Sequence, residues 1–127
     1  MSKKILVIDD ERVMARMITG ILNRNGYEAQ TVASVYDALT NFPDLPFDLV
    51  TCDMLLPDIS GLDFLELMYT RKGCPQRPVL LVTAMSQADL LDKATKLGAI
   101  GILQKPFTVS QLLDEISRTF EKIGAGN

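Results

Sequence analysis

The chain contains four short apolar runs, and each is followed by a residue suited to binding phosphate or metal. The runs are continuous rather than alternating, which is typical of strands covered on both faces in a parallel sheet. They are residues 5–8 before Asp9 and Asp10, 49–52 before Asp53, 79–82 before Thr83, and 100–104 before Lys105. The carboxyl ends of parallel strands meet at one edge of a sheet, where open α/β folds bind their ligands. We therefore expect three carboxylates, a hydroxyl and an ammonium group to meet at that edge.

Helical patterns alternate with apolar runs along the whole chain. Strands are expected at residues 4–8, 27–33, 47–52, 79–82 and 100–104, and helices at 11–25, 34–41, 61–71, 86–97 and 108–123. Such alternation, with no repeat and no internal linker, is typical of a parallel sheet with crossover helices. The segment 27–33 is the most polar strand, so we expect it at an edge. The sequence predicts one α/β domain over residues 1–123, with residues 124–127 as a flexible tail or the start of a linker.

Several local signals predict details of the helices. Ser34 and Ser86 are expected to cap the helices that follow them, because a serine side chain can accept a bond from an orphan backbone amide. Residues 108–111 resemble a capping box. Met14 and Met17 lie at helical spacing with other apolar residues and are expected in the core.

Composition excludes several classes of function. The 127 residues carry a net charge of −3, which gives no general attraction to nucleic acid or to an anionic membrane surface. No stretch approaches the ~20 apolar residues of a membrane span, and no signal peptide is recognisable, so we expect a cytoplasmic protein. The chain has no histidine, the commonest zinc ligand. Cys52 and Cys74 do not form a disulfide framework, and Cys52 is expected to be a small buried hydrophobic residue.

The residues at the strand ends suit magnesium and phosphoryl chemistry. Asp9, Asp10 and Asp53 would repel one another unless a cation were bound, and carboxylates without nitrogen or sulfur ligands nearby favour Mg²⁺. Lys105 can reach a phosphate or neutralise a carboxylate, and Thr83 adds a hydroxyl donor. Phosphoryl transfer mainly needs positioning and neutralisation of oxygen charge, and a carboxylate beside a metal and a lysine can act as nucleophile.

Each of these residues has a simpler explanation when it is taken alone. An Asp-Asp pair after a strand commonly begins a helix, since acidic residues suit its first turn. Thr83 by itself could be a structural cap, and Lys105 with Pro106 could be a solvated turn. Their occurrence together after neighbouring strands favours a functional site.

Together, the motifs resemble the receiver domains of two-component response regulators. The matching segments are VIDD at 7–10, DMLLPDISGLDFL at 53–65, VTA at 82–84 and GAIGILQKPF at 98–107. The resemblance covers essentially the whole chain and depends on the conjunction of these segments. It implies a doubly wound, flavodoxin-like three-layer sandwich with a five-stranded parallel sheet in the order 2-1-3-4-5.

The resemblance also implies a division of roles among the acidic residues. Asp53 would accept a phosphoryl group from a sensor histidine kinase or a histidine phosphotransfer protein. Asp10, Asp53 and the backbone carbonyl of Leu55 would bind Mg²⁺ directly, and Asp9 would act through a metal-bound water. Two-component signalling or a phosphorelay is the process implied.

A second group of residues would respond to the new charge. Thr83 and Lys105 would contact the phosphoryl oxygens, and the peptide bond before Pro106 would be cis. Thr83 and Ile102 are the expected switch residues. Many receivers have an aromatic residue at the position of Ile102, and a rotamer change of isoleucine is a smaller event than burial of a ring. Aromatic signalling through residue 102 is therefore excluded.

Further expectations concern partners and the lifetime of the phosphoryl group. The face made by helix 86–97, strand 100–104 and helix 108–123 is expected to bind a downstream protein or an effector domain outside this chain. It could also form a homodimer, with candidate contacts at Gln87, Leu90, Leu91 and Gln111. Leu55 and Met85 are apolar neighbours of the site, and we expect them to restrict water and slow loss of the phosphoryl group.

These residues are compatible with three functions. The first is a phosphorylation-controlled switch with slow autodephosphorylation, which is not a conventional turnover enzyme. The second is an interaction module that uses the same fold without phosphorylation, which Ile102 slightly favours. The third is a small phosphatase of the haloacid-dehalogenase type, but that family has an acid two residues after its nucleophile, and Leu55 stands there. The acids, Thr83 and Lys105 favour the switch.

Overall fold

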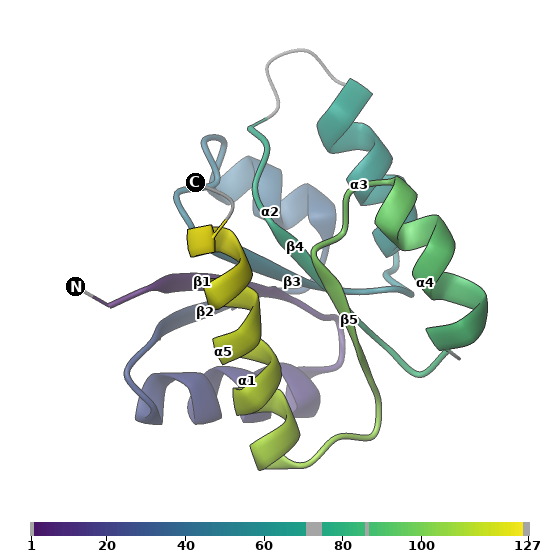
Figure 1. The fold of residues 1–127 in the computed structure, drawn as a ribbon. Helices are drawn as coiled ribbons and strands as arrows, with labels where there is room; N and C mark the ends of the chain where they lie inside the picture. Colours follow the sequence, from purple (N-terminus) through teal and green to yellow (C-terminus); the bar gives the residue numbers. More distant parts are fainter. Residues whose placement is uncertain (1, 71–74, 86, 126–127) are drawn as a thin grey trace.

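The computed structural model describes residues 2–70, 75–85 and 87–125, in which strands and helices alternate (Figure 1). The strands are β1 (Lys4–Ile8), β2 (Glu28–Val32), β3 (Leu49–Asp53), β4 (Val79–Thr83) and β5 (Gly101–Gln104). The helices are α1 (Arg12–Arg24), α2 (Val35–Asn41), α3 (Gly61–Thr70), α4 (Gln87–Lys96) and α5 (Val109–Ala125). Among the described residues, none of the helices combines the length and apolar character that crossing a bilayer requires.

The strands form one parallel sheet in the order β2-β1-β3-β4-β5. This arrangement confirms the doubly wound α/β fold predicted from the sequence. All positions of β3 and β4 are buried, whereas β2 has exposed positions and lies at an edge, as its polar sequence indicated. In the register of the sheet, Ile8 pairs with Cys52, so the residues that follow β1 lie beside the end of β3.

Helices cover both faces of the sheet and create two separate cores. Helices α1 and α5 pack on one face, and α2, α3 and α4 pack on the other (Figure 1). Successive strand residues point to opposite faces, so Ile5 and Val7 belong to one core while Leu6 and Ile8 belong to the other. Burial on both faces explains why the strands are continuous apolar runs.

The helix ends follow local sequence signals. The Ser34 hydroxyl accepts a hydrogen bond from the amide of Asp37 at 3.0 Å, which confirms the cap of α2. The Thr108 amide donates to Gln111 Oε1 at 2.8 Å, and the Gln111 amide donates to Thr108 Oγ1 at 3.0 Å, so the capping box before α5 is also confirmed. The cap expected at Ser86 lies outside the described residues, as does Cys74.

Other details differ from the sequence-based prediction. Strand β3 begins at Leu49 rather than at residue 47, and α5 continues to Ala125 rather than ending at 123. Met17 is 41% exposed, so its expected place in the core was wrong. The buried stripe of α1 instead contains Ala15, Ile18, Ile21 and Leu22.

Replacing Gly61 with alanine tests how closely α3 approaches the end of β3. A Cβ atom at this position would lie 2.9 Å from Leu81 Cδ2 and 3.0 Å from the carbonyl oxygen of Asp53. We expect Gly61→Ala to lower the free energy of unfolding by about 1 to 3 kcal/mol, the usual cost of overpacking. Urea denaturation followed by circular dichroism measures this change.

The matched control is Gly124→Ala in α5, where the added Cβ would meet no atom within 4 Å apart from its chain neighbours and the backbone of its own helix. Alanine there should leave the free energy of unfolding unchanged or raise it by up to about 1 kcal/mol, because glycine weakens a helix. Equal effects of the two substitutions would contradict a close approach at Gly61.

Candidate functional site

The three acidic residues expected at the edge of the sheet lie together in the structure. Asp9 and Asp10 directly follow β1, and Asp53 is the last residue of β3. One carboxylate oxygen from each lies within 4.8 Å of the other two. Asp9 and Asp53 are buried, whereas Asp10 is exposed. The cluster is therefore partly enclosed and is reached from the side of Asp10.

A single lysine is shared between the two buried acids. Lys105 follows β5, and its Nζ lies 3.4 Å from Asp9 Oδ2 and 3.4 Å from Asp53 Oδ2. Burial alone would lower the pKa of Lys105, but the charges of Asp9 and Asp53 outweigh it and raise this pKa. The lysine is thus held as a cation between two carboxylates.

The contact with Lys105 does not fully offset the cost of burying the negative charge of Asp53. Burial raises the pKa of its carboxyl group, the Lys105 ammonium opposes that rise, and the charge of Asp9 adds to it. A hydrogen bond from the Leu55 backbone amide also favours the ionised form, yet the pKa of Asp53 remains above its ordinary value. Additional positive charge near these acids would remove the imbalance.

The donor set of this cluster fits a magnesium ion. The oxygens of Asp9, Asp10 and Asp53 are hard ligands, and their mutual distances allow contact with one cation. The exposed side of Asp10 leaves room for water, which Mg²⁺ retains when it binds to proteins. The Leu55 amide donates a hydrogen bond to Asp53. Metal binding by the Leu55 carbonyl stays a prediction.

The remaining predicted residues lie at the end of β4, within β5 and directly after β5. Thr83 is buried at the end of β4, and its hydroxyl accepts a hydrogen bond from the Met85 amide at 3.0 Å. Ile102 is buried in the core between β5 and the helices on the α4 side. The peptide bond between Lys105 and Pro106 is cis, which is the isomer implied by the resemblance.

Comparison with known proteins identifies the family. The model of the response regulator receiver domain matches residues 5–117. This chain belongs to the response regulator receiver family. Two of its relatives are the chemotaxis protein CheY of Pseudomonas aeruginosa, 32% identical over 94% of this chain and 98% of the relative, and CheY-3 of Vibrio cholerae, 31% identical over 94% and 93%.

Solved structures agree with this assignment. The chemotaxis response regulator CheY4 of Vibrio cholerae superimposes with a TM-score of 0.84 at 27% identity, covering 94% of this chain and 99% of that one. A BeF₃-activated DrrB receiver domain gives a TM-score of 0.79 at 28% identity, covering 95% and 99%. A receiver domain protein of Methanospirillum hungatei, at 24% identity, has the same fold, with a TM-score of 0.85 and full coverage of both chains.

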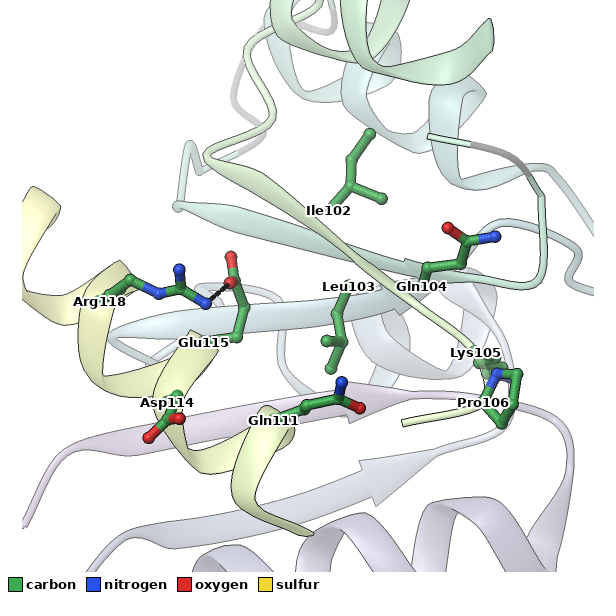
Figure 2. A pocket seen from close by; sticks show the side chains of 9 residues that line it. All are labelled: Ile102, Leu103, Gln104, Lys105, Pro106, Gln111, Asp114, Glu115 and Arg118. Carbon is green, nitrogen blue, oxygen red and sulfur yellow. Dashed lines mark hydrogen bonds and ion pairs between the residues drawn. The ribbon is translucent and has the colours of Figure 1, made fainter. Parts of the chain in front are cut away.

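An open pocket of about 450 Å³ lies between β5 and α5 of this receiver domain (Figure 2). Ile102 and Leu103 point to opposite sides of β5, and Gln111 lies beside Leu103 (Figure 2). The residues lining the pocket are Ile102, Leu103, Gln104, Lys105, Pro106, Gln111, Asp114, Glu115 and Arg118. Lys105 therefore belongs both to the rim of this pocket and to the acidic site.

The residues expected on the partner-binding face have different environments. Gln111 is exposed and lines the pocket, and Leu91 is 51% exposed. Leu90 is only 3% exposed because it packs in the core, so its expected place on the surface was wrong. The side chain of Gln87 lies outside the described part of the chain. The sequence did not predict that Asp114, Glu115 and Arg118 line this pocket, because in the sequence they are typical charged residues of a helix surface.

Cys52 is a buried residue of the core, as expected. Burial raises the pKa of its thiol, and the nearby charges of Asp53, Asp58 and Asp9 raise it further. A protonated, enclosed thiol is a poor nucleophile. Cys52 is therefore a poor candidate for chemistry at this edge of the sheet, and the acidic residues are the candidates.

Removing the charge of Asp53 should stabilise the fold of this receiver domain. In metal-free buffer at neutral pH, we expect Asp53→Asn to raise the free energy of unfolding by about 1 kcal/mol, because burial of the carboxylate and repulsion from Asp9 outweigh its attraction to Lys105. Lys105 keeps its contact with Asp9 in this variant. Urea denaturation measures the gain, and the exposed Asp92→Asn should show none.

The stabilisation of the fold by Asp53→Asn should also depend on pH. Since the pKa of Asp53 is raised in the folded protein, its ionised form costs stability above that raised pKa. This cost disappears as the pH falls toward the ordinary value of 3.8, because the folded protein takes up the proton first. A stabilisation by Asp53→Asn that stays constant down to this pH would contradict the electrostatic origin.

Proposed function

We propose that this receiver domain is a phosphorylation-controlled signalling switch in which Asp53 accepts a phosphoryl group. The observation that carries the proposal is the arrangement of Lys105 between Asp9 and Asp53, beside the exposed carboxylate of Asp10. The site has an acidic nucleophile, a fixed cation and oxygen ligands for a metal ion. These are the components that phosphoryl transfer requires.

The phosphoryl group comes from a donor outside these 127 residues, since they contain no histidine. The proposed donor is the phosphohistidine of a sensor histidine kinase or of a histidine phosphotransfer protein. A carboxylate oxygen of Asp53 forms a bond to phosphorus as the bond from phosphorus to the donor nitrogen breaks. The electron pair of the broken bond stays on the donor imidazole, which takes up a proton.

The acids have distinct roles in this proposal. Asp10, Asp53 and the Leu55 carbonyl would hold Mg²⁺ directly, and Asp9 would contact it through water. When bound, the ion would supply positive charge that neutralises oxygen charge. Asp9 also positions Lys105. Its Oδ2 accepts a hydrogen bond from Lys105, and its Oδ1 accepts one from the Glu11 amide at 2.9 Å. Both oxygens of Asp9 are thereby oriented by the protein.

Thr83 and Lys105 detect the new charge. The Lys105 ammonium already contacts the carboxylate that would be modified, so it can move to a phosphoryl oxygen over a short distance. The Thr83 hydroxyl accepts a bond from Met85 and still has its own hydrogen to donate. Its movement would shift the loop after β4 and the packing around Ile102, without burial of an aromatic ring.

The output is a change in protein binding at the face formed by α4, β5 and α5. The pocket between β5 and α5 supports this proposal because Lys105 lines it and also reaches Asp53. Its occupant would be a downstream protein, an effector domain outside this chain, or a second copy of this domain. We place this activity in the cytoplasm, with no contact to nucleic acid or membrane by this domain.

One alternative retains the fold without the chemistry. Ile102 packs as an ordinary core residue, which is what a constitutive interaction module would show. A switch would bind its partner differently with and without a phosphoryl group on Asp53. A constitutive module would bind the same partner equally in both states.

Incubation with Mg²⁺ and a small acyl phosphate should add one phosphoryl group to the wild-type domain, as seen by intact-protein mass spectrometry. Asp53→Asn should abolish this gain because the nucleophile is lost. BeF₃ with Mg²⁺, which mimics the phosphoryl group, should bind the wild type and not the variant. The relative DrrB has been activated with this reagent.

The control is Asp92→Asn, an exposed acid of α4 that pairs with Lys96 at 3.2 Å. This variant should be phosphorylated like the wild type. Labelling that persists in Asp53→Asn, or that needs no divalent ion, would refute the assignment of the acceptor.

Two apolar side chains should control how long the phosphoryl group lasts. Leu55 is 71% exposed and Met85 is 43% exposed, two residues after Asp53 and Thr83 respectively. The substitutions Leu55→Asn and Met85→Glu add polar groups that can orient water. We expect the double variant to lose its phosphoryl group about tenfold faster, less than the ~10²–10⁴ effect of a positioned general base. Equal first-order decay rates in a filter assay would show that neither side chain restricts water.

A further inference from the structure

The loop between β3 and α3 is attached to α2 by the carboxylate of one of its own residues, Asp58. Asp58 Oδ2 accepts a hydrogen bond from the Tyr36 amide at 2.8 Å, and Oδ1 accepts a longer one from the Val35 amide at 3.4 Å. Both amides belong to the first turn of α2. The loop that follows Asp53 is thus connected to a helix more than twenty residues earlier in the sequence.

The base of the same loop is closed by its own backbone. The Gly61 amide donates to the Met54 carbonyl at 2.9 Å, and Leu55 and Ser60 form an antiparallel bridge. Two strand-like ends brought together in this way leave residues 56–59 as a short projecting turn. Asp58 lies in that turn, so its contact with α2 fixes the direction in which the loop projects.

The loop also reaches the acidic site directly. The Leu55 backbone amide donates to the Asp53 carboxylate, and this bond favours the ionised form of Asp53. Leu55 is therefore fixed on one side by Ser60 and makes contact with Asp53 on the other. A change in the direction of the loop would alter how the backbone of Leu55 meets the carboxylate.

We propose that Asp58 is a positioning residue for the site at Asp53: by tying the loop to α2, it keeps the backbone of Leu55 oriented toward the acceptor carboxylate and its metal ion. The inference rests on the proposed function and deepens it. It assigns to α2 a mechanical connection with the phosphorylation site, in addition to the connection through Thr83 and β5.

The contact does more than complete the cap of α2, because it joins this helix to the loop that follows Asp53. The Ser34 hydroxyl already accepts from the Asp37 amide at 3.0 Å. Asp58 binds different amides and comes from a different segment. Although partial burial disfavours its charge, bonds from the amides of Tyr36, Ile59, Asp58 itself and Val35 hold the pKa of Asp58 below its ordinary value. The tether is thus anionic at neutral pH.

The test compares Asp58→Ala with Asp58→Asn and Ser34→Ala. Alanine at 58 removes both the charge and the acceptor, whereas asparagine removes the charge and keeps an oxygen for the Tyr36 amide. Ser34→Ala removes the other cap of α2 and leaves the loop contact intact. Melting temperatures measured in metal-free buffer show how much each change loosens the helix.

The main readout is the affinity for Mg²⁺ itself, measured by calorimetry because the chain has no tryptophan to report binding by fluorescence. For Asp58→Ala we expect about tenfold weaker binding, the lower end of the effect of removing a group that orients metal ligands. Asp58→Asn should recover most of the affinity, and Ser34→Ala should match the wild type. Hydrogen exchange at the Leu55 amide should accelerate in Asp58→Ala alone.

Two results would overturn the inference. An equal loss of affinity in Asp58→Asn and Asp58→Ala would show that the charge acts on the ion from a distance, without positioning. An unchanged affinity and exchange rate in Asp58→Ala would show that the contact serves only α2. If the wild type binds no Mg²⁺, the proposed function fails as well, and that result is distinct from either of the others.

Discussion

The structure depends on the compensation of negative charge at the carboxyl edge of the sheet. Three acidic side chains lie close together there, and Lys105 contacts the two buried ones. Burial, which is the main cause, and the charge of Asp9 keep the pKa of Asp53 raised despite the ammonium of Lys105. Such an arrangement costs stability in a fold that is otherwise apolar on both faces of the sheet. In the proposed switch the excess negative charge would have a use, because it would attract a divalent cation and make the site sensitive to a further anionic group.

The parallel sheet is what brings this charge together. Strands β1 and β3 are neighbours although a whole β-strand and two helices separate them in sequence, and their register places Asp9 beside Asp53. Burial of both faces fixes the strands, since any slip by one residue would exchange the side chains of the two cores. The acidic residues therefore sit on a rigid support. In the proposed switch, the groups that would respond lie on the loops after β3 and β4 and at the end of β5.

The sequence alone was sufficient for the fold and for the composition of the acidic site. Continuous apolar runs predicted a sheet buried on both faces, and the polar residue after each run indicated which side chains would meet. It was insufficient where exposure depends on packing between distant elements. Leu90 and Met17 occupy similar amphipathic patterns, yet Leu90 enters the core and Met17 does not. Asp58 gave no signal, because an acid after a proline in a loop has no periodicity, and its partners at Val35 and Tyr36 are defined only by the folded chain.

The packing of Ile102 bears on how a charge at Asp53 could act at a distance. An isoleucine buried beneath α4 can change rotamer, but it cannot transfer a large ring between solvent and core. The loop after β3 provides a second connection, since its backbone meets Asp53 through Leu55 and its tip meets α2 through Asp58. A phosphoryl group on Asp53 would compete with the Leu55 amide for space and hydrogen bonds at one end of this loop. In a domain where the side chain at position 102 contributes little movement, that competition makes α2 a natural second site at which the phosphorylated and unphosphorylated forms would differ.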